Sequence, residues 1–486
     1  MNVISSLTRT ALALLLPLSA AAQQPITLAD AVALARERSH EAHAARATRD
    51  AARYSHHAFG SLLFPQLSLD ATLPIYTRSI TAVPQPDGTT DFLALRRMNG
   101  MATATLTQKL PLTGGDLFVS SSLAGYSTRL TGQPLDERWY STPLSIGLRQ
   151  PLLRPNTVAW DRRVDNVASE LAERSYVEAM ETVSLGATNA FFDVYAARLG
   201  LDNAVKNAAV NDTLYRLNRG RFDVGKIGEN DLLQSELALL RARAALEDAR
   251  LGYERAADAL RLTLNLPADT RIDVAVTEAV PEFDADTARA VAEALKNRAA
   301  MSSVALDEVQ ARRALAVARL GGGPGATVQA SYGLNAAALN ARSAYQDLGE
   351  ARGFSLSFQI PLWQWGAHAD RVRAAEADRE RVTSQSQVTV EQTAHEARFA
   401  ALDLGQARRN LVLVAKADSV ADKRFEVAYN RYVIGRIGVD NLYIAQSEKD
   451  QALVQFVQAL RGYWVAYYRL RRATLFDFAT GQGIRG

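Results

Sequence analysis

Histidines are the side chains of this sequence best suited to metal chemistry, because the chain contains six of them and no cysteine. His40 and His43 are three residues apart in a helical pattern, and His56 and His57 are adjacent. A metal centre needs three or four converging ligands, and the sequence places no cluster of carboxylates or thiols beside these histidines. We therefore expect exposed helical histidines and no metal site.

A glycine-rich stretch at residues 321–325 could in principle cradle a phosphate. It lacks the Lys-Ser or Lys-Thr pair that completes a phosphate-binding loop, and it lies where a helical pattern gives way to a strand, which favours a flexible hinge. The sequence also has no Gly-x-Ser-x-Gly motif. These patterns indicate neither an enzyme nor a bound cofactor.

The distribution of charge excludes the nucleic-acid-binding proteins. The chain has 55 basic and 52 acidic residues and a net charge of +3, and the two signs are interspersed. A phosphate backbone is bound by a sustained basic surface. We expect no nucleic-acid partner.

Glycines mark two segments at which the chain must reverse. They are Gly225 and Gly228 in the first segment, and Gly435 and Gly438 in the second. Each pair lies between two long helical patterns, where glycine supplies the backbone freedom of a tight turn. The elements on either side decide what these turns can do.

The two turns belong to an internal repeat. A shift of 210 residues places residues 221–228 (Arg-Phe-Asp-Val-Gly-Lys-Ile-Gly) on residues 431–438 (Arg-Tyr-Val-Ile-Gly-Arg-Ile-Gly). A search for such repeats precedes any assignment of fold, because each copy is one structural unit. We interpret the chain as a first repeat over residues 23–280 and a second over residues 281–486.

Three helical stretches recur in each repeat. They are rich in strong helix formers, and Gly and Pro are nearly confined to the joints. At 1.5 Å per residue the middle helix of each repeat would be about 90 Å long, so we expect long rods packed side by side. The predicted helices are residues 27–63, 160–218 and 229–264, then 286–320, 367–430 and 439–476.

Between the helices, short stretches alternate apolar and polar residues, which predicts strands with one apolar and one polar face. Two such strands per repeat, of about 10 residues and joined by long polar loops at one end only, are typical of a membrane barrel. Four strands cannot close a barrel alone, because about eight is the smallest closed form. Oligomerisation is implied. The stretches are residues 67–75, 144–148, 328–334 and 354–360.

The first repeat also carries an insertion. Near the N-terminus the shift between the repeats is 259, which places Pro65 on Pro324, and its difference from 210 is 49 residues. The insertion lies between about Ile75 and Thr142 and alternates around a turn at residues 111–116. It is either an extra hairpin of the barrel or a folded loop outside the membrane.

Aromatic residues flank the strand ends. Trp139 and Tyr140 stand near one, and Trp363 and Trp365 near another. Aromatic rings are enriched at both membrane–water interfaces. Packing at the join between helix and strand is the alternative role.

The N-terminus has the pattern of an export signal. Arg9 precedes an apolar run at residues 11–18, and three alanines precede Gln23, as the cleavage rule requires. We predict a signal peptide over residues 1–22. An anchoring helix would need roughly 20 apolar residues, and no later stretch meets that requirement.

Several motifs together resemble the TolC family of outer-membrane efflux proteins. Residues 26–35 are similar to the family's first helix. Residues 149–153 (Arg-Gln-Pro-Leu-Leu) and 359–363 (Gln-Ile-Pro-Leu-Trp) resemble its Q-P-L-F step from strand to helix. The two glycine turns resemble its R-Y-x-x-G pattern and are followed by segments similar to L-L-x-A-Q. The order, spacing and duplication of the motifs are specific, and the resemblance covers essentially the whole mature chain.

The resemblance implies a mostly α-helical fold with membrane β-structure. A homotrimer would form one shared β-barrel in the outer membrane that continues into a long periplasmic α-helical barrel. The protein would passively conduct substrates for a tripartite efflux or type I secretion system. Its partners would be outer-membrane lipid, a periplasmic adaptor protein and, through the adaptor, an inner-membrane transporter. If the inserted hairpin joins the barrel, the family's four strands per chain become six and the trimer has about 18.

The resemblance also assigns roles to the turns. Their glycines would dock the adaptor's hairpins. A threefold ring of carboxylates would narrow the tunnel and favour cations, with a basic residue pairing to hold it shut. The gate candidates are Asp440, Asp231, Arg436 and Lys226. Capping of a helix N-terminus is the alternative role of the aspartates.

A periplasmic coiled-coil scaffold or adaptor is the alternative function. Such a protein would also be exported and rich in helix. An adaptor, however, needs a single hairpin with compact β domains, whereas this chain has duplicated hairpins and strands amphipathic enough to face lipid.

Overall fold

The computed structural model describes residues 25–276 and 280–485, so the predicted signal peptide lies outside the described residues. The chain divides into two compact units, and each unit takes segments from both repeats. We call them the helical unit and the sheet unit. The helical unit holds the residues up to Ala42, Val183–Glu282 and Ala407–Val465; the sheet unit holds His43–Thr182, Phe283–Gln406 and Ala466–Gly486.

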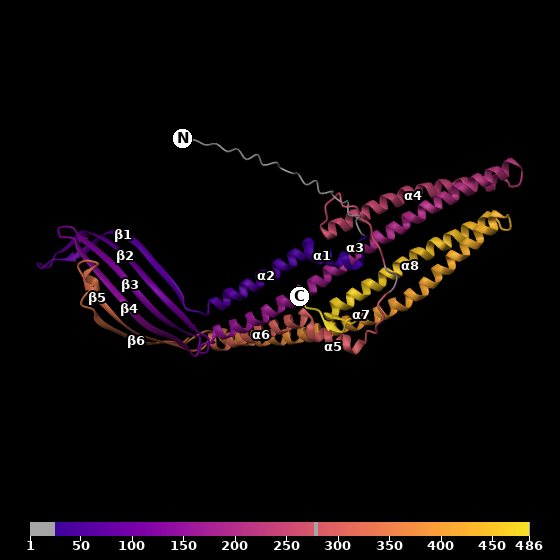
Figure 1. Ribbon diagram of the computed structural model, residues 1–486. Helices are drawn as coiled ribbons and strands as arrows, with labels where there is room; N and C mark the ends of the chain where they lie inside the picture. Colours follow the sequence, from indigo (N-terminus) through magenta and orange to yellow (C-terminus); the bar gives the residue numbers. More distant parts are fainter. Residues whose placement is uncertain (1–24, 277–279, 486) are drawn as a thin grey trace, which may run out of the picture. The chain divides into compact units, whose positions relative to one another are not determined.

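Six strands of the sheet unit form one antiparallel sheet in chain order (Figure 1). They are β1 (Gln66–Pro84), β2 (Thr90–Leu110), β3 (Gly115–Leu130), β4 (Asp136–Leu152), β5 (Gly325–Ala338) and β6 (Gly349–Gln359). The insertion forms β2 and β3, which pair with β1 and β4. The inserted hairpin is therefore part of the sheet, and the folded-loop alternative is wrong.

The hairpin also changes where the loops lie. The turn after β2 falls within the predicted segment, and Pro111 in this turn accepts a hydrogen bond from Asn156 at 2.9 Å. At the end of β2, Gln108 donates to the carbonyl of Leu63 at 2.7 Å. Both partners belong to the joins between helix and strand, so one turn lies at the end of the sheet where the helices begin. This turn is the one predicted between the inserted strands, and it is a tight turn of residues 111–114 and not a long loop.

The cross-strand register sorts the side chains onto two faces. Directly paired residues share a face. The pairing confirms the predicted alternation except at Ile75, which a register shift after Thr72 places opposite Asn99 on the polar face. One row of the apolar face consists of Leu67, Leu106, Val119, Ile146 and Tyr332. The row beside it on the polar face consists of Ser68, Thr105, Ser120, Ser145 and Gly333.

Two predicted helices are each broken in two. Residues 27–63 form α1 (Leu28–Arg38) and α2 (His40–Ser61), and residues 286–320 form α5 (Thr287–Asn297) and α6 (Ala299–Gly321). The breaks lie at Ser39 and Arg298, whose backbones are extended with ψ of 150° and 141°. The backbone N–H groups that follow each break donate to side chains.

The partners come from different places. Ser39 accepts a hydrogen bond from the backbone N–H of Ala42 at 3.1 Å, as a helix N-cap does. At the second break the N–H of Ala299 donates instead to the Glu178 carboxylate of α3 at 2.9 Å. Glu178 also accepts from Arg298 at 2.7 Å. A cap supplied by another helix has no local sequence signal, so the pattern of residues alone predicted a continuous helix.

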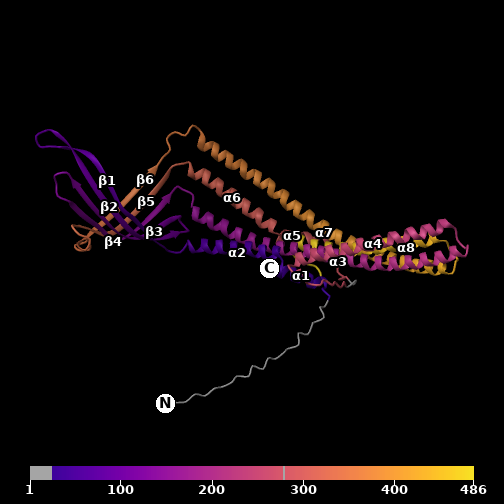
Figure 2. The same ribbon diagram turned by 90° about the horizontal axis from the view of Figure 1, so that it is seen from above.

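The remaining helices repeat in length. Helices α3 (Thr157–Asp223) and α7 (Ala367–Val433) each have 67 residues, and α4 (Glu229–Leu264) and α8 (Val439–Thr474) each have 36. In the helical unit α3 runs antiparallel to α4, and α7 to α8 (Figure 2). No helix within the described residues combines the length and hydropathy needed to cross a membrane.

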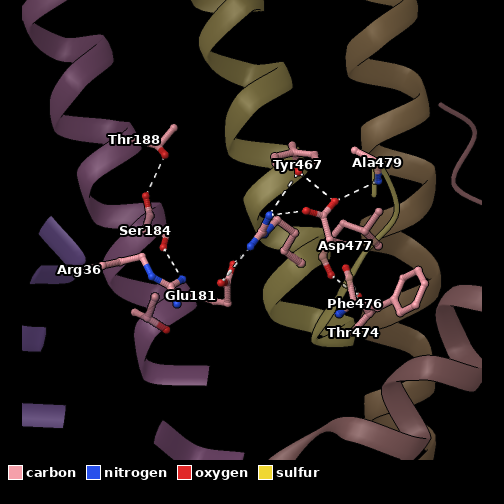
Figure 3. A network of polar contacts seen from close by, with 12 residues as sticks. Arg36, Glu181, Ser184, Thr188, Tyr467, Thr474, Phe476, Asp477 and Ala479 are labelled. Carbon is pink, nitrogen blue, oxygen red and sulfur yellow. Dashed lines mark hydrogen bonds and ion pairs between the residues drawn. The ribbon is translucent and has the colours of Figure 1, made fainter. Parts of the chain in front are cut away.

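The end of α8 is held in the sheet unit by buried ion pairs. Arg471 donates to Glu181 of α3 at 3.0 Å and to Asp477 of β7 (Phe476–Asp477) at 2.7 Å. Tyr467 donates to the same Asp477 carboxylate at 3.0 Å (Figure 3). Strand β7 pairs with β8 (Gln482–Gly483). This network fixes the C-terminal hairpin against α3.

Candidate functional site

The two helical tips, residues 221–231 and 431–441, have the same backbone structure. In the first, the N–H of Lys226 bonds the carbonyl of Arg221 at 2.8 Å, and the N–H of Gly225 bonds that of Phe222 at 2.8 Å. The second tip repeats both bonds 210 residues later, each at 2.9 Å. This pair of bonds is the Schellman motif, in which a left-handed residue ends the helix.

The four tip glycines serve different needs. Gly225 and Gly435 have φ of +70° and +74°, which side-chain-bearing residues rarely adopt. Gly228 is the N-cap of α4 with φ of −81°, so its backbone would accept any residue. No atom lies within 4 Å of a Cβ built at any of the four, Gly438 included. The tips are therefore open surfaces.

A small core lies behind the tips in the helical unit. It consists of Leu214, Tyr432, Val439 and Leu442. The hydroxyl of the buried Tyr432 donates to Asn218 at 2.8 Å, so α7 is bonded to α3. No motif in the sequence distinguishes Asn218 from its neighbours in α3. The only signal was the aromatic position in the turn motif, which does not name its partner.

An arginine completes this link between the tips. Arg221 places its guanidinium 5.3 Å from the centroid of the Tyr432 ring. Its Nη2 donates to the carbonyl of Val433 at 3.3 Å. The first turn is thereby held to the second by a cation–π contact and a hydrogen bond.

The gate candidates lie close to these turns. Asp440 is exposed, and its carboxylate accepts a hydrogen bond from Gln234 of α4 at 2.7 Å. Asp231 is half-buried in the first turn of α4, while Lys226 and Arg436 are exposed. Within the described part of the chain, no ion pair joins either base to either aspartate.

Asp231 does not occupy the N-cap position of α4. The N-cap of α4 is Gly228, which makes no side-chain hydrogen bond, and Asp231 lies three residues further on. Asp440 bonds across to α4. Both carboxylates still lie in a first turn, where the helix dipole favours negative charge.

A hollow opens between α4 and α8 just behind the tips. Its lining includes Gln234, Arg241, Tyr443 and Asp450. The hydroxyl of Tyr443 is buried without a hydrogen-bond partner. Burial, together with the nearby Tyr432 and Asp440, raises the pKa of Tyr443 to about 12. The tyrosine is therefore neutral at physiological pH.

The other sequence candidates do not form a site. His56 contacts the Asp165 carboxylate at 2.5 Å, a partner 109 residues away that no sequence pattern indicates. No group of three or more metal-ligating side chains converges anywhere in residues 25–276 or 280–485. Residues 321–325 join the end of α6 to the start of β5, as predicted for a hinge.

Comparisons with known proteins bear on the whole architecture. Residues 31–266 match the sequence model of the outer membrane efflux protein family. Comparison with the sequences of curated proteins gives no match.

Solved structures share the fold at low sequence identity. The Campylobacter jejuni CmeC outer membrane channel has a TM-score of 0.67 and 17% identity over 94% of this chain and 86% of that one. The Vibrio cholerae outer membrane protein VceC has a TM-score of 0.65 and 15% identity, covering 94% and 97%. The open-state Neisseria gonorrhoeae MtrE outer membrane channel has a TM-score of 0.66 and 14% identity, covering 94% and 89%.

The amphipathic sheet, the duplicated long helices and the match over residues 31–266 agree with one another. These observations argue against the alternative function, a periplasmic scaffold or adaptor. They also confirm the resemblance on which the expectations of fold and location rested. The chain belongs to the outer membrane efflux protein family and is an outer-membrane channel protein that extends into the periplasm.

Proposed function

We propose that three copies of this chain assemble into one conduit that passively carries substrates from the periplasm to the exterior for a tripartite efflux or type I secretion system. The observation that carries the proposal is the sheet, which is open at both edges. Among the strands of residues 25–276 and 280–485, β1 and β6 each have a neighbour on one side only. Their apolar residues are unusually exposed, with Leu69 at 73% and Phe354 at 74%. Exposed apolar edge strands invite pairing with another chain.

If copies of the same chain close the sheet into a barrel, both edge strands gain a hydrogen-bonded neighbour. All neighbouring strands are antiparallel, so in a sheet of six strands β1 and β6 run in opposite directions. The β6 of one chain can therefore pair antiparallel with the β1 of the next. Three such sheets give 18 strands, and barrels of about 16–18 strands leave an aqueous channel. The polar face would line that channel and the apolar face would meet lipid.

Cysteine crosslinking tests the closure, because the chain contains no cysteine of its own. Ser68→Cys on β1 is combined in turn with Ser355→Cys or Ser357→Cys on β6, all on the polar face. On oxidation in outer membranes, one of the pairs is expected to give covalent dimers and trimers and no larger species. Replacing Ser68→Cys with Leu67→Cys moves the thiol to the opposite face and should abolish the product.

Two results would contradict the closure. If every combination with Ser68→Cys gave only monomers, β1 of one chain would not pair with β6 of the next. A ladder that ends at another number of chains would remove the trimer.

The open tips are proposed as the docking surface for a periplasmic adaptor, which in turn contacts an inner-membrane transporter. Gly228→Trp adds a bulky ring to a tip whose backbone accepts it and where no atom obstructs it. We expect transport to be lost while crosslinked trimers still form. Bulky residues at Gly225 or Gly435 should have the same effect. Gly200→Trp places the same ring on an exposed, equally unobstructed position of α3 and serves as the control. Unchanged transport in Gly228→Trp would remove the docking role.

The carboxylates beside the tips are proposed as a gate that favours cations. In a trimer three copies of Asp440 or Asp231 would form a ring, and Arg436 or Lys226 of a neighbouring chain could pair with it. Asp440→Asn should lower the cation preference of single channels in planar bilayers. The control is Asp248→Asn, which neutralises an exposed carboxylate further along α4. Equal selectivity in the two variants would leave Asp440 with only its bond to Gln234.

A further inference from the structure

Three arginines lie side by side on the apolar face of the sheet. Arg78 of β1 is paired directly with Arg96 of β2, and Arg96 is paired with Arg129 of β3. All three are exposed. Side chains so paired are about 5 Å apart at Cβ, and like charges in this arrangement destabilise a sheet. We call these residues the arginine row.

No carboxylate of the described chain pairs with the arginine row. The ion pairs at this end of the sheet join Arg138 with Asp136 and Arg352 with Glu350 instead. Glu137 is the nearest acidic residue on the same face by register, because it is paired with Ser127, two residues before Arg129 in β3. The row therefore keeps an excess of positive charge that the protein itself does not balance.

The height of the row places it at the outer surface of the membrane. Strand β1 carries exposed apolar residues from Leu67, near the helices, and reaches Arg78 after eleven residues. At about 3.3 Å per residue this length is about 36 Å, and a strand tilt of about 40° reduces it to about 28 Å across the membrane. The apolar band of such barrels is about 25 Å tall. Leu67 at the periplasmic interface thus puts Arg78 at the level of the outer headgroups.

A hollow of about 390 Å³ adjoins the row on the membrane side. Its floor consists of Gly100 and Gly125, which are paired across β2 and β3 and have no side chains to fill the space. Its walls include Met98, Leu123 and Trp139. Met98 lies two residues from Arg96 in β2 and so shares its face. The hollow therefore begins where the arginine row ends.

The shape of the hollow depends on its glycines. A Cβ at Gly125 would lie 3.1 Å from the Trp139 ring, and a Cβ at Gly100 would lie 3.3 Å from the carbonyl oxygen of Thr72. The register of β1 also shifts between Thr72 and Ile75. The lining is largely apolar, and Glu137 contributes a carboxylate to it. A pocket of this size falls in the range of ligand sites.

We propose that the arginine row and the hollow together bind a phosphate-bearing lipid of the outer leaflet. The guanidinium groups of Arg78, Arg96 and Arg129 would hold the phosphates, because Arg matches phosphate oxygens with paired N–H donors. An acyl chain would fill the hollow below them. Glu137 would accept a hydrogen bond from a headgroup hydroxyl. The inference rests on the outer-membrane location of the sheet and does not require the trimer, the adaptor or the gate.

Lipid binding to the full-length, detergent-solubilised protein tests the charge requirement. Native mass spectrometry would compare lipid A, which carries phosphates and several acyl chains, with zwitterionic phosphatidylcholine. Arg96→Gln should weaken lipid A binding by about tenfold or more, the effect of losing a charged hydrogen bond. Arg97→Gln is the matched control, because Arg97 is the adjacent exposed arginine on the polar face. Equal affinity in the two variants, or equal binding of phosphatidylcholine, would overturn the proposal.

A second variant tests the hollow. Met98→Trp should fill it and weaken lipid A binding, whereas Leu106→Trp adds the same ring to the apolar face outside the hollow. Inorganic phosphate alone is expected to compete poorly, because it lacks the acyl chain. Displacement of lipid A by phosphate at a concentration equal to that of lipid would show that the hollow has no part in binding. Equal loss in Met98→Trp and Leu106→Trp would contradict it as well.

Discussion

Arg471→Met tests the buried ion-pair network that ends α8. The side chain of Glu181 is 0% exposed, that of Asp477 13% and that of Arg471 19%. Burial alone would lower the pKa of Arg471. The hydrogen bonds and charge of Glu181 outweigh burial, so its pKa lies above its usual value. The guanidinium is thus a countercharge that both carboxylates share, and Met would take this charge and its hydrogen bonds away from both.

The expected cost follows from that burial. Removing one partner of a buried pair typically costs 3–5 kcal/mol, chiefly because the remaining charge is uncompensated. Arg471 is partly exposed, so we expect about 3 kcal/mol, the lower end of that range. If local opening governs hydrogen exchange, this cost corresponds to a roughly hundredfold faster exchange of the last turns of α8.

Hydrogen–deuterium exchange measured by mass spectrometry gives the exchange rates of the backbone amides in the last turns of α8. Arg472→Met is the control, because Arg472 is the adjacent exposed arginine of α8. Adding Glu181→Gln to Arg471→Met should recover part of the lost protection, since it neutralises one of the two buried carboxylates that have lost the arginine. Equal protection in Arg471→Met and Arg472→Met would refute the reasoning, and so would a further loss in the double variant.

Three further predictions concern single residues. Gly225→Ala should speed protease cleavage of the first tip, because an alanine at the φ of +70° costs about 1–2 kcal/mol. Gly228→Ala should leave the cleavage rate unchanged, because the φ of Gly228 is −81°. Equal cleavage rates in the two variants would contradict the prediction. Tyr443→Phe should leave stability unchanged or raise it by up to about 1 kcal/mol, because the hydroxyl is buried without a partner. The pKa of Tyr443 is raised from its normal value of 10.0 to about 12, so the wild type should lose stability as the pH rises through that interval. The stability of Tyr443→Phe, measured by urea unfolding, should depend less on pH over the same interval. Arg298→Ala should weaken the join of α5 to α6 by about 2 kcal/mol, because it removes the partner of Glu178, and exchange at Ala299 would report it.

The sequence predicted the elements that have a periodic signal. The bounds of α4 agree with the prediction residue for residue, and those of α8 differ only at the C-terminal end. The start of β1 and the turn at residues 111–116 could also be predicted, because the alternation of a strand and the residues of a turn are local properties of the chain. The glycine turns followed from the positive φ that only glycine adopts readily.

The sequence did not predict features that depend on distant partners. Glu178 lies 121 residues from the Ala299 N–H that it caps, and Asn218 lies 214 residues from Tyr432. The candidate site shows the same limit. The glycines and charges of the tips were found from the sequence, whereas the bond between Asp440 and Gln234 emerged only from the structure.

The sequence by itself determined the repeat, the helices and the amphipathic strands, because each depends on neighbouring residues. Only the tertiary structure decided that the inserted hairpin joins the sheet. That choice depends on hydrogen bonds between β1 and β2 and between β3 and β4. The same pairing aligns Arg78, Arg96 and Arg129, which are scattered in the sequence. Register between strands is a non-local property, because it is set where separate segments meet and not within any one of them.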